Sequence, residues 1–86
     1  MIKIPSTFTA VLRRETAGRK GKVVTVVDRL PRHETFLNEL ARYLKTRCGT
    51  GGTCRMSSTG GQIEIQGDQR ERIRELLQEQ GIPFKG

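Results

Sequence analysis

The chain has 86 residues, enough for one domain with a single modest hydrophobic core. Hydrophobic residues make up 34% and charged residues 29%, which is compatible with folding, and no apolar run is long enough to cross a membrane. Lys and Arg number 16 against 9 Asp and Glu, for a formal net charge of +7. Residues 1–58 carry 12 basic and 4 acidic side chains, whereas residues 59–86 carry 4 and 5. This clustering favours a nucleic-acid-binding protein over a charge that serves only solubility.

The first residues contain no apolar segment of the kind found in secretory signal peptides. Cys48 and Cys54 are too few for a zinc site, because zinc takes about four ligands and the single histidine, His33, belongs to a different segment. Their spacing also allows a disulfide. We interpret both thiols as reduced, in a cytoplasmic protein that needs no metal or cofactor.

The N-terminal part predicts a β-hairpin. Apolar and polar side chains alternate over residues 7–13, as in a half-buried strand. Residues 15–22 break this pattern, and the β-branched run of residues 23–27 predicts a second strand. Residues 28–32 include a proline and are predicted to form a loop that leads into a helix.

Apolar residues at helical spacing predict the first helix. Its buried stripe consists of Phe36, Leu37, Leu40, Ala41 and Leu44. Arg42 and Lys45 fall off this stripe, on the side that faces solvent. Gly49 is placed to cap the C-terminal end of the helix.

The second half of the chain predicts two more strands and a helix. Residues 53–57 and residues 62–66 alternate as strands, with a turn at residues 58–61. Asp68 and Glu71 stand at capping-box spacing, which predicts that Asp68 caps the second helix. Its buried stripe is Ile73, Leu76 and Leu77, and Gly81 closes it. Residues 82–85 are an optional last strand, placed at an edge by Pro83.

The predicted element order is therefore β-β-α-β-β-α with an optional final strand. Each helix has a single apolar stripe, so both can lie on one face of one sheet. The sequence predicts an α+β fold, a two-layer sandwich with one mostly antiparallel or mixed sheet. Residues 1–86 are expected to form one domain, with residues 1–6 as a flexible start.

Residues 45–55, KTRCGTGGTCR, are the predicted docking surface for an anionic partner. Glycines can adopt positive φ and let a partner approach the backbone closely, and cations lie on both sides of this loop. The residues assigned to this surface are Arg42, Lys45, Arg47, Gly49, Thr50, Gly51, Gly52, Thr53 and Arg55.

The tip of the predicted hairpin holds Arg19, Lys20 and Lys22, separated by Gly18 and Gly21. These cations are predicted to neutralise nucleic-acid phosphates, with a solvated turn as the alternative. A phosphate-binding loop is excluded, because only two residues separate the glycines and a strand follows instead of a helix. The later glycine loop fails as a dinucleotide fingerprint, since a helix precedes it and a strand follows.

No group of side chains predicts an enzyme. The chain has one histidine, and neither its carboxylates nor its serines have a reason to converge on a base. Cys48 lies near Lys45 and Arg47 in sequence, which would suit an activated thiol, but a small buried residue at a helix end is the favoured interpretation.

Aromatic residues are scarce, with three Phe, one Tyr and no Trp. The predicted outward strand positions are Thr7, Thr9, Val11, Thr25, Thr53, Arg55, Gln62, Glu64 and Gln66. A sheet that stacks RNA bases displays aromatic rings on its open face, so this mode of binding is not expected. Phosphate and shape contacts from loops and one helix face remain.

Three motifs occur together in one order: GRKGK at 18–22, LKTRCGTGGT at 44–53 and IEIQGDQR at 63–70. In this order and spacing they resemble the translation initiation factor 1 family of the eukaryotic and archaeal type, which has bacterial members. The resemblance runs from about residue 18 to the end, and the short chain is similar to the prokaryotic members. It implies the same two-layer α+β fold.

The resemblance also implies a monomeric factor that binds the small ribosomal subunit near the P site, contacts rRNA and monitors initiator tRNA and start-codon pairing. It implies that the basic tip (Arg19, Lys20 and Lys22) points toward the tRNA, and that Lys45, Arg47 and the glycine loop dock on rRNA. Arg70 belongs to the family motif at the last helix, in which Gly67 and Asp68 are mainly structural. The alternative is a general RNA-binding or translation-stress module without a start-site role.

Overall fold

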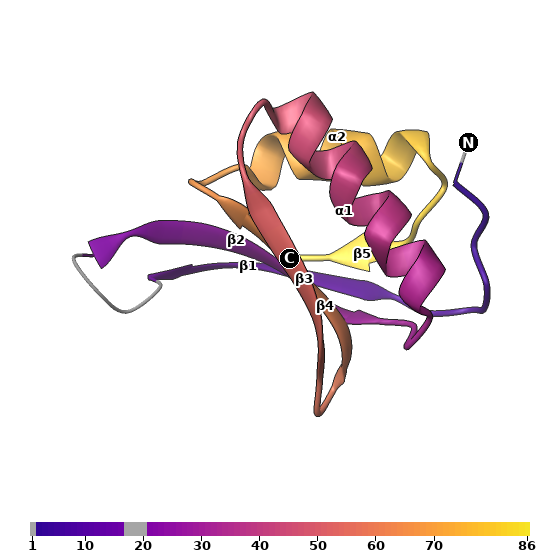
Figure 1. Ribbon diagram of the computed structural model, residues 1–86. Helices are drawn as coiled ribbons and strands as arrows, with labels where there is room; N and C mark the ends of the chain where they lie inside the picture. Colours follow the sequence, from indigo (N-terminus) through magenta and orange to yellow (C-terminus); the bar gives the residue numbers. More distant parts are fainter. Residues whose placement is uncertain (1, 17–20) are drawn as a thin grey trace.

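The computed structural model describes residues 2–16 and 21–86 and shows a five-stranded sheet with two helices on one face (Figure 1). The elements are β1 (Ala10–Thr16), β2 (Val23–Leu30), α1 (Glu34–Cys48), β3 (Gly52–Ser57), β4 (Gly60–Gln66), α2 (Arg70–Glu79) and β5 (Phe84–Lys85). The strand order is β3-β4-β2-β1-β5, with β5 parallel to β1 and the other pairs antiparallel. The predicted α+β fold is confirmed, including the short strand at an edge.

The core lies between the helices and the sheet and is built from the stripes that the sequence predicts. The helices contribute Phe36, Leu37, Leu40, Ala41, Leu44, Ile73, Leu76 and Leu77, all buried. The central strands contribute Leu12, Val27, Ile63 and Ile65. Phe8 lies before β1 and packs edge-to-face on Phe36, with 5.8 Å between the ring centroids. Within the described residues, no helix is long and apolar enough to cross a membrane.

Three predicted boundaries differ in the structure. β1 begins at Ala10 rather than at residue 7. β2 continues through Leu30, although residues 28–32 were expected to be a loop, because Leu30 is buried opposite Gly61 of β4. The pairing register shifts between Val27 and Leu30, and Arg29 in this irregularity has φ 59°. The turn between β3 and β4 is also shorter than predicted, since β4 already begins at Gly60.

One predicted side-chain direction is also wrong. Thr25 was expected to face outward, but it pairs with the core residue Ile65 and is fully buried on the helix side. Its hydroxyl donates to the carbonyl of Gly67 at 2.7 Å and accepts from the Gln69 N–H at 2.7 Å. Thr25 therefore binds the backbone at the start of α2, which was the role predicted for Asp68.

The predicted capping box does not form. The residue that caps α2 is Gln69, without a side-chain hydrogen bond. The Asp68 carboxylate lies 3.5 Å from the Arg70 N–H and pairs with the Arg70 guanidinium at 2.9 and 3.1 Å. Capping-box spacing alone did not decide the outcome, because a buried hydroxyl from a neighbouring strand satisfies the backbone instead.

Candidate RNA-binding surface

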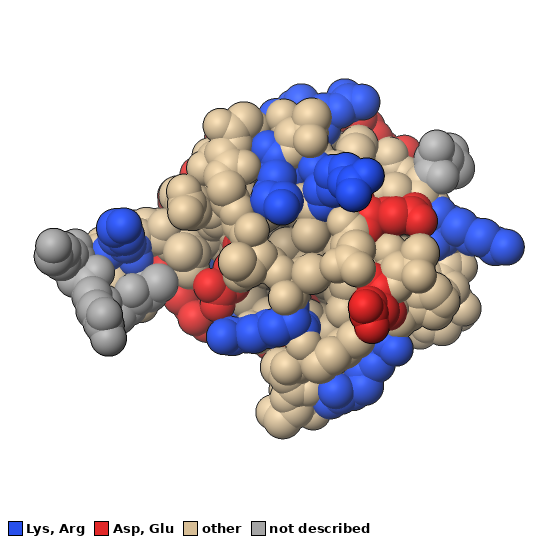
Figure 2. All heavy atoms as spheres, in the orientation of Figure 1, with Lys and Arg blue, Asp and Glu red and all other residues tan. Residues whose placement is uncertain are grey.

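The C-terminal half of α1 carries a group of cations. Arg42 and Arg47 are exposed and Lys45 is half-buried, and residues 40–63 contain no acidic residue. Figure 2 shows Lys and Arg gathered over the upper part of α1 in this view, with acidic side chains toward its other end. The helix is therefore polarised in charge along its length, and its basic end adjoins the glycine loop.

Tyr43 orients part of this group, a role that the sequence analysis did not assign. The Arg47 guanidinium carbon lies 5.3 Å from the centre of the Tyr43 ring, in a cation–π contact. The Tyr43 hydroxyl donates to Glu79 of α2 at 3.4 Å. The spacing of four residues between Tyr43 and Arg47 on one helix was the available signal.

The loop after α1 is fixed at both ends by its backbone. Gly49 takes the left-handed conformation (φ 66°) and its N–H bonds to the carbonyl of Lys45, which confirms the predicted cap. The Thr50 N–H reaches the same carbonyl at 3.2 Å, and the Gly51 carbonyl accepts from the Gln66 N–H at 3.0 Å. The loop is thus held between the end of α1 and the end of β4.

Gly51 and Gly52 have different surroundings, and neither has positive φ. A Cβ at Gly51 would meet only the Gln66 side chain, at 3.4 Å. A Cβ at Gly52 would lie 2.8 Å from Ile65 Cδ1 and closer still to the Glu64 carbonyl oxygen. Gly52 is therefore required by packing against β4, and only Gly51 presents an open backbone to a partner.

The predicted docking surface is divided between the two sides of the sheet. Thr53 and Arg55 pair with Glu64 and Gln62 on the open face, opposite the helices. Arg55 is engaged there, 3.2 Å from the Glu64 carboxylate and 2.9 Å from the Gln62 side-chain oxygen. Among the described strand residues none on this face is aromatic, in line with the expectation that bases do not stack there.

Arg70 belongs neither to the cations of α1 nor to the open-face residues of β3, because its guanidinium is paired with Asp68 at the start of α2. Lys22 is exposed just before β2, and the strands β1 and β2 extend beyond the helices in Figure 1. Arg19 and Lys20 lie outside the described residues, so the predicted basic tip is represented in the structure by Lys22 alone.

A basic residue that the sequence analysis did not assign lies near the turn between β3 and β4. Arg32 is exposed, and its guanidinium donates to the carbonyl of Ser57. In the sequence Arg32 follows Pro31, and nothing but its positive charge drew attention to it. Its position shows that exposed cations occur at both ends of β3.

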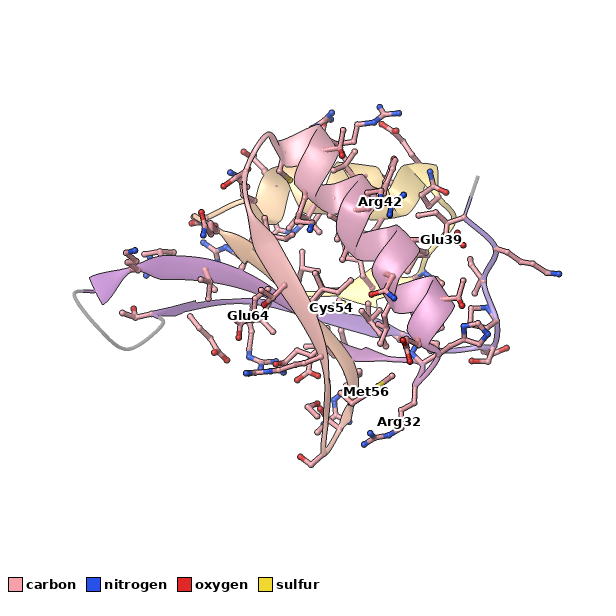
Figure 3. The ribbon with its side chains drawn as sticks, viewed as in Figure 1. Arg32, Glu39, Arg42, Cys54, Met56 and Glu64 are labelled. Atoms are coloured by element: carbon pink, nitrogen blue, oxygen red, sulfur yellow. The ribbon has the colours of Figure 1, made fainter. Side chains whose placement is uncertain are left out.

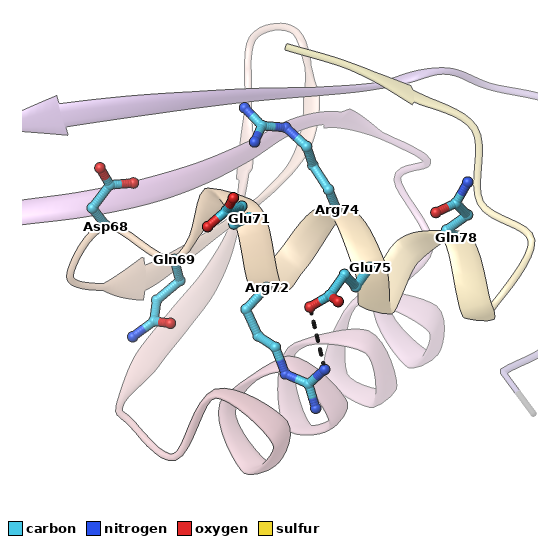
Figure 4. Close-up of a pocket in the computed structure, with 7 residues that line it drawn as sticks. All are labelled: Asp68, Gln69, Glu71, Arg72, Arg74, Glu75 and Gln78. Carbon is cyan, nitrogen blue, oxygen red and sulfur yellow. Dashed lines mark ion pairs between the residues drawn. The ribbon is translucent and has the colours of Figure 1, made fainter.

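The outer side of α2 has a broad hollow of about 690 Å³ (Figure 4). Its charges are mixed: three carboxylates face two arginines, and Arg72 lies 3.6 Å from Glu75. In the described residues no buried side-chain nitrogen or oxygen lacks a hydrogen-bond partner, so no unsatisfied group points into this hollow. Mixed charges of this kind are typical of a helix face exposed to solvent.

Cys48 is not an activated thiol. Burial raises its pKa, and the charge of Arg72 lowers it less, so the thiol stays protonated at neutral pH. Among the described residues, no three His, Cys, Asp or Glu side chains come together where they could hold a metal ion. The chemistry that this surface offers is the binding of anions by exposed cations.

Comparison with known proteins decides the family. The model of the family described as translation initiation factor SUI1 matches residues 9–83. The chain belongs to the SUI1 family. The match covers both helices and four of the five strands in full, so it spans almost the whole fold rather than a single motif. The resemblance drawn from the three motifs is confirmed.

Relatives in this family occur in archaea and in bacteria. The protein translation factor SUI1 homolog of Hyperthermus butylicus is 45% identical over 65 residues, which is 76% of this chain and 59% of that protein. The uncharacterized protein YciH of Salmonella typhimurium is 40% identical over 74 residues, 86% of this chain and 65% of that protein. YciH of Escherichia coli is 39% identical over 74 residues. The chain thus spans about two thirds or less of the length of these relatives.

Proposed function

We propose that this domain binds the small ribosomal subunit near the P site and influences the selection of initiator tRNA and start codon. The support is its membership of a translation initiation factor family together with the basic end of α1. Arg42, Lys45 and Arg47 would contact rRNA phosphates, and the neighbouring Gly51 would let the RNA backbone approach the loop. The protein acts in the cytoplasm as a monomer in this proposal.

The observation that carries the proposal is the local excess of positive charge beside a rigid loop. Four basic residues and no acidic residue lie between residues 40 and 63. The loop is fixed by hydrogen bonds to α1 and β4, so it costs little conformational entropy to order it on binding. A surface built only for solubility would not need this order.

The test is co-sedimentation with purified small subunits through a sucrose gradient. The triple variant Arg42→Ala, Lys45→Ala, Arg47→Ala is expected to bind about tenfold to a hundredfold more weakly, because three phosphate contacts are lost. The matched control is Lys3→Ala, Arg74→Ala, Lys85→Ala, which removes the same charge from residues outside this surface. Equal weakening by both variants would contradict a defined docking surface.

A second candidate is a general RNA-binding or translation-stress module. The cations of α1 favour this function as much as the first, since phosphate contacts carry no sequence information. The two functions differ in how they respond to a competitor. A start-site factor is expected to keep its small-subunit complex in excess unrelated structured RNA, whereas a general binder would be displaced in proportion to the RNA added.

A further inference from the structure

Strand β3 forms an edge of the sheet, and among the described strands it pairs only with β4. The Gly51 carbonyl bonds to Gln66 of β4, which sets the alternation of the ladder. Residues 53, 55 and 57 then direct their backbone groups toward β4, and Gly52, Cys54 and Met56 direct their N–H and C=O groups away from the sheet. Such a row of backbone groups is a template for a further strand.

This edge lacks the usual protection against pairing. Natural edge strands carry lysine, proline or a bulge, and β3 has none of these. Its one charged residue, Arg55, points to the open face and pairs with Glu64 there. The backbone on the edge is therefore accessible to a partner strand.

A groove lies beside this edge, between β3 and α1. It has a volume of about 250 Å³ and is lined by Glu34, Leu37, Asn38, Cys54, Arg55 and Met56. Met56 is 46% exposed, which is high for a large hydrophobic residue, and Figure 3 shows it projecting from β3 on the side of α1. Cys54 contacts Asn38 across the groove, with 3.3 Å from Sγ to Oδ1. A strand added to β3 would direct alternate side chains into this groove.

The charges around the groove identify the kind of partner. Arg55 of its lining is exposed, and so is Arg32, which bonds to the Ser57 carbonyl at the end of β3. Glu34 is the acidic residue of the lining, and Glu39 lies farther along α1 beside Arg42. A second copy of this chain would bring another net charge of +7 to the same place. Nucleic acid would neutralise the arginines but offers no backbone to pair with an edge strand. An acidic polypeptide satisfies the edge, the apolar groove and the charge together.

We propose that β3 and its groove bind an extended segment of an acidic partner protein, which adds to the sheet as a sixth strand. Apolar side chains of that segment would alternate into the groove against Met56, Cys54 and Leu37, and its carboxylates would face the surrounding arginines. This protein-binding surface lies apart from the cations at the end of α1, so it does not rest on the proposed ribosomal function.

The test begins with a phage-displayed library of random peptides about twelve residues long, selected on the wild-type protein. Enrichment of acidic sequences with alternating apolar residues is expected. The selected peptide, synthesised with a fluorescent label, is then titrated with Met56→Lys and with the control Ile4→Lys. Both positions are exposed and both changes add one positive charge. Met56→Lys is expected to bind the peptide at least about tenfold more weakly, whereas Ile4→Lys should stay within about twofold of wild type.

A backbone test separates strand addition from simple adhesion to the groove. Methylation of every second peptide nitrogen should abolish binding in one register and preserve it in the other, because a strand pairs through alternate residues. Equal effects in both registers would overturn the proposal.

Three other results would also overturn it. The first is a selection without enrichment of acidic peptides. The second is a wild-type dimer in sedimentation equilibrium that Met56→Lys converts to monomer, which would assign the edge to a second copy. The third is a loss of small-subunit binding in Met56→Lys as large as that of the α1 triple variant, which would assign the edge to RNA.

Discussion

At the scale of single residues, Asp28 is a buried carboxylate on the open face of the sheet. Arg13 donates to it at 2.8 Å, the Arg29 N–H at 2.7 Å and the Thr59 hydroxyl at 2.8 Å. Burial alone would raise its pKa, but these bonds, with a contribution from Gln62, outweigh burial and lower the pKa from 3.8 to about 2. One carboxylate thus links β1, the irregular end of β2 and the turn between β3 and β4.

This lowered pKa predicts an acid-dependent loss of stability. A depressed pKa stabilises the fold above the unfolded value, and the stabilisation is lost as pH falls from about 4 through about 2. Its size is on the order of 2 kcal/mol. Asp28→Asn should lower the free energy of unfolding at pH 7 by about 1–3 kcal/mol. Urea titrations from pH 7 to pH 2 should show the wild type and variant converging in acid; a constant gap would show that Asp28 acts through shape alone.

The two central glycines of the docking loop give a second residue-scale prediction. Gly52→Ala places a Cβ against backbone and a core side chain of β4, so it should lower the free energy of unfolding by about 1–3 kcal/mol. Gly51→Ala meets only a flexible exposed side chain and should change stability by less than about 1 kcal/mol. Thermal melts followed by circular dichroism measure both.

Binding separates the roles of these two glycines further. Gly51→Val should weaken small-subunit binding while the melt stays close to wild type, because the branched side chain obstructs the open backbone. Sequence alone assigned both glycines to the partner. The sequence does not show that β4 packs tightly against the second of these glycines, Gly52.

At the scale of elements, periodicity predicted the helices and the order of the strands, because each pattern reports burial on one face. The stripe ending at Leu44 and the cap at Gly49 are local features, and local sequence determines them. Pairings between distant segments were not predictable in this way. Thr25 reaches the start of α2 across more than 40 residues, and the extension of β2 to Leu30 depends on Gly61.

The same distinction between local and long-range features applies to the candidate RNA-binding surface. The cations of α1 follow from helical spacing: Arg42 and Lys45 were both predicted to face solvent, and Arg42 is exposed whereas Lys45 is half-buried. That Arg55 lies on the opposite face from Arg42 depends on which residues of β3 pair with β4, a long-range property. The sequence therefore indicates which residues are cations on the helix, but not which of the predicted residues lie on the same face.

The hairpin of β1 and β2 provides an element-scale prediction. In the proposed function, α1 docks the protein on rRNA and the hairpin monitors the initiator tRNA. The change of Arg19, Lys20 and Lys22 to alanine should then weaken small-subunit binding by no more than about tenfold, because each exposed phosphate contact contributes little. The same variant should strongly reduce discrimination between correct and near-cognate start codons. Dissociation rates of initiator tRNA from programmed subunits measure this discrimination.

The control for the hairpin is the α1 triple variant, which should show the reverse pattern: weak binding, with codon discrimination intact once the subunit is saturated. A wild-type protein that leaves tRNA dissociation unchanged at every codon would favour the general RNA-binding module. The fold assignment would be unaffected by that result.

At the scale of the whole molecule, the question is whether the net charge of +7 or a few local contacts dominates binding. The molecule measures 36 × 26 × 21 Å, whereas electrostatic screening in physiological salt acts over about 8 Å. Lys85 lies on β5, at the opposite edge of the sheet from β3, so its charge is screened from a partner that docks at the loop before β3. Affinity at physiological salt should therefore depend on the number of cations that contact the partner, and not on the total charge.

Salt dependence measures that number. If about four to six phosphates are neutralised, the logarithm of affinity for small subunits should fall with the logarithm of salt concentration at a slope of roughly −3 to −5. The Arg42, Lys45, Arg47 triple variant should reduce the magnitude of the slope by about 2–3, because each lost contact removes about one. The control variant of Lys3, Arg74 and Lys85 should keep the wild-type slope although its net charge equals that of the triple variant. A wild-type slope near zero would rule out phosphate contacts as the basis of binding, and equal slopes in the two variants would mean that only total charge matters.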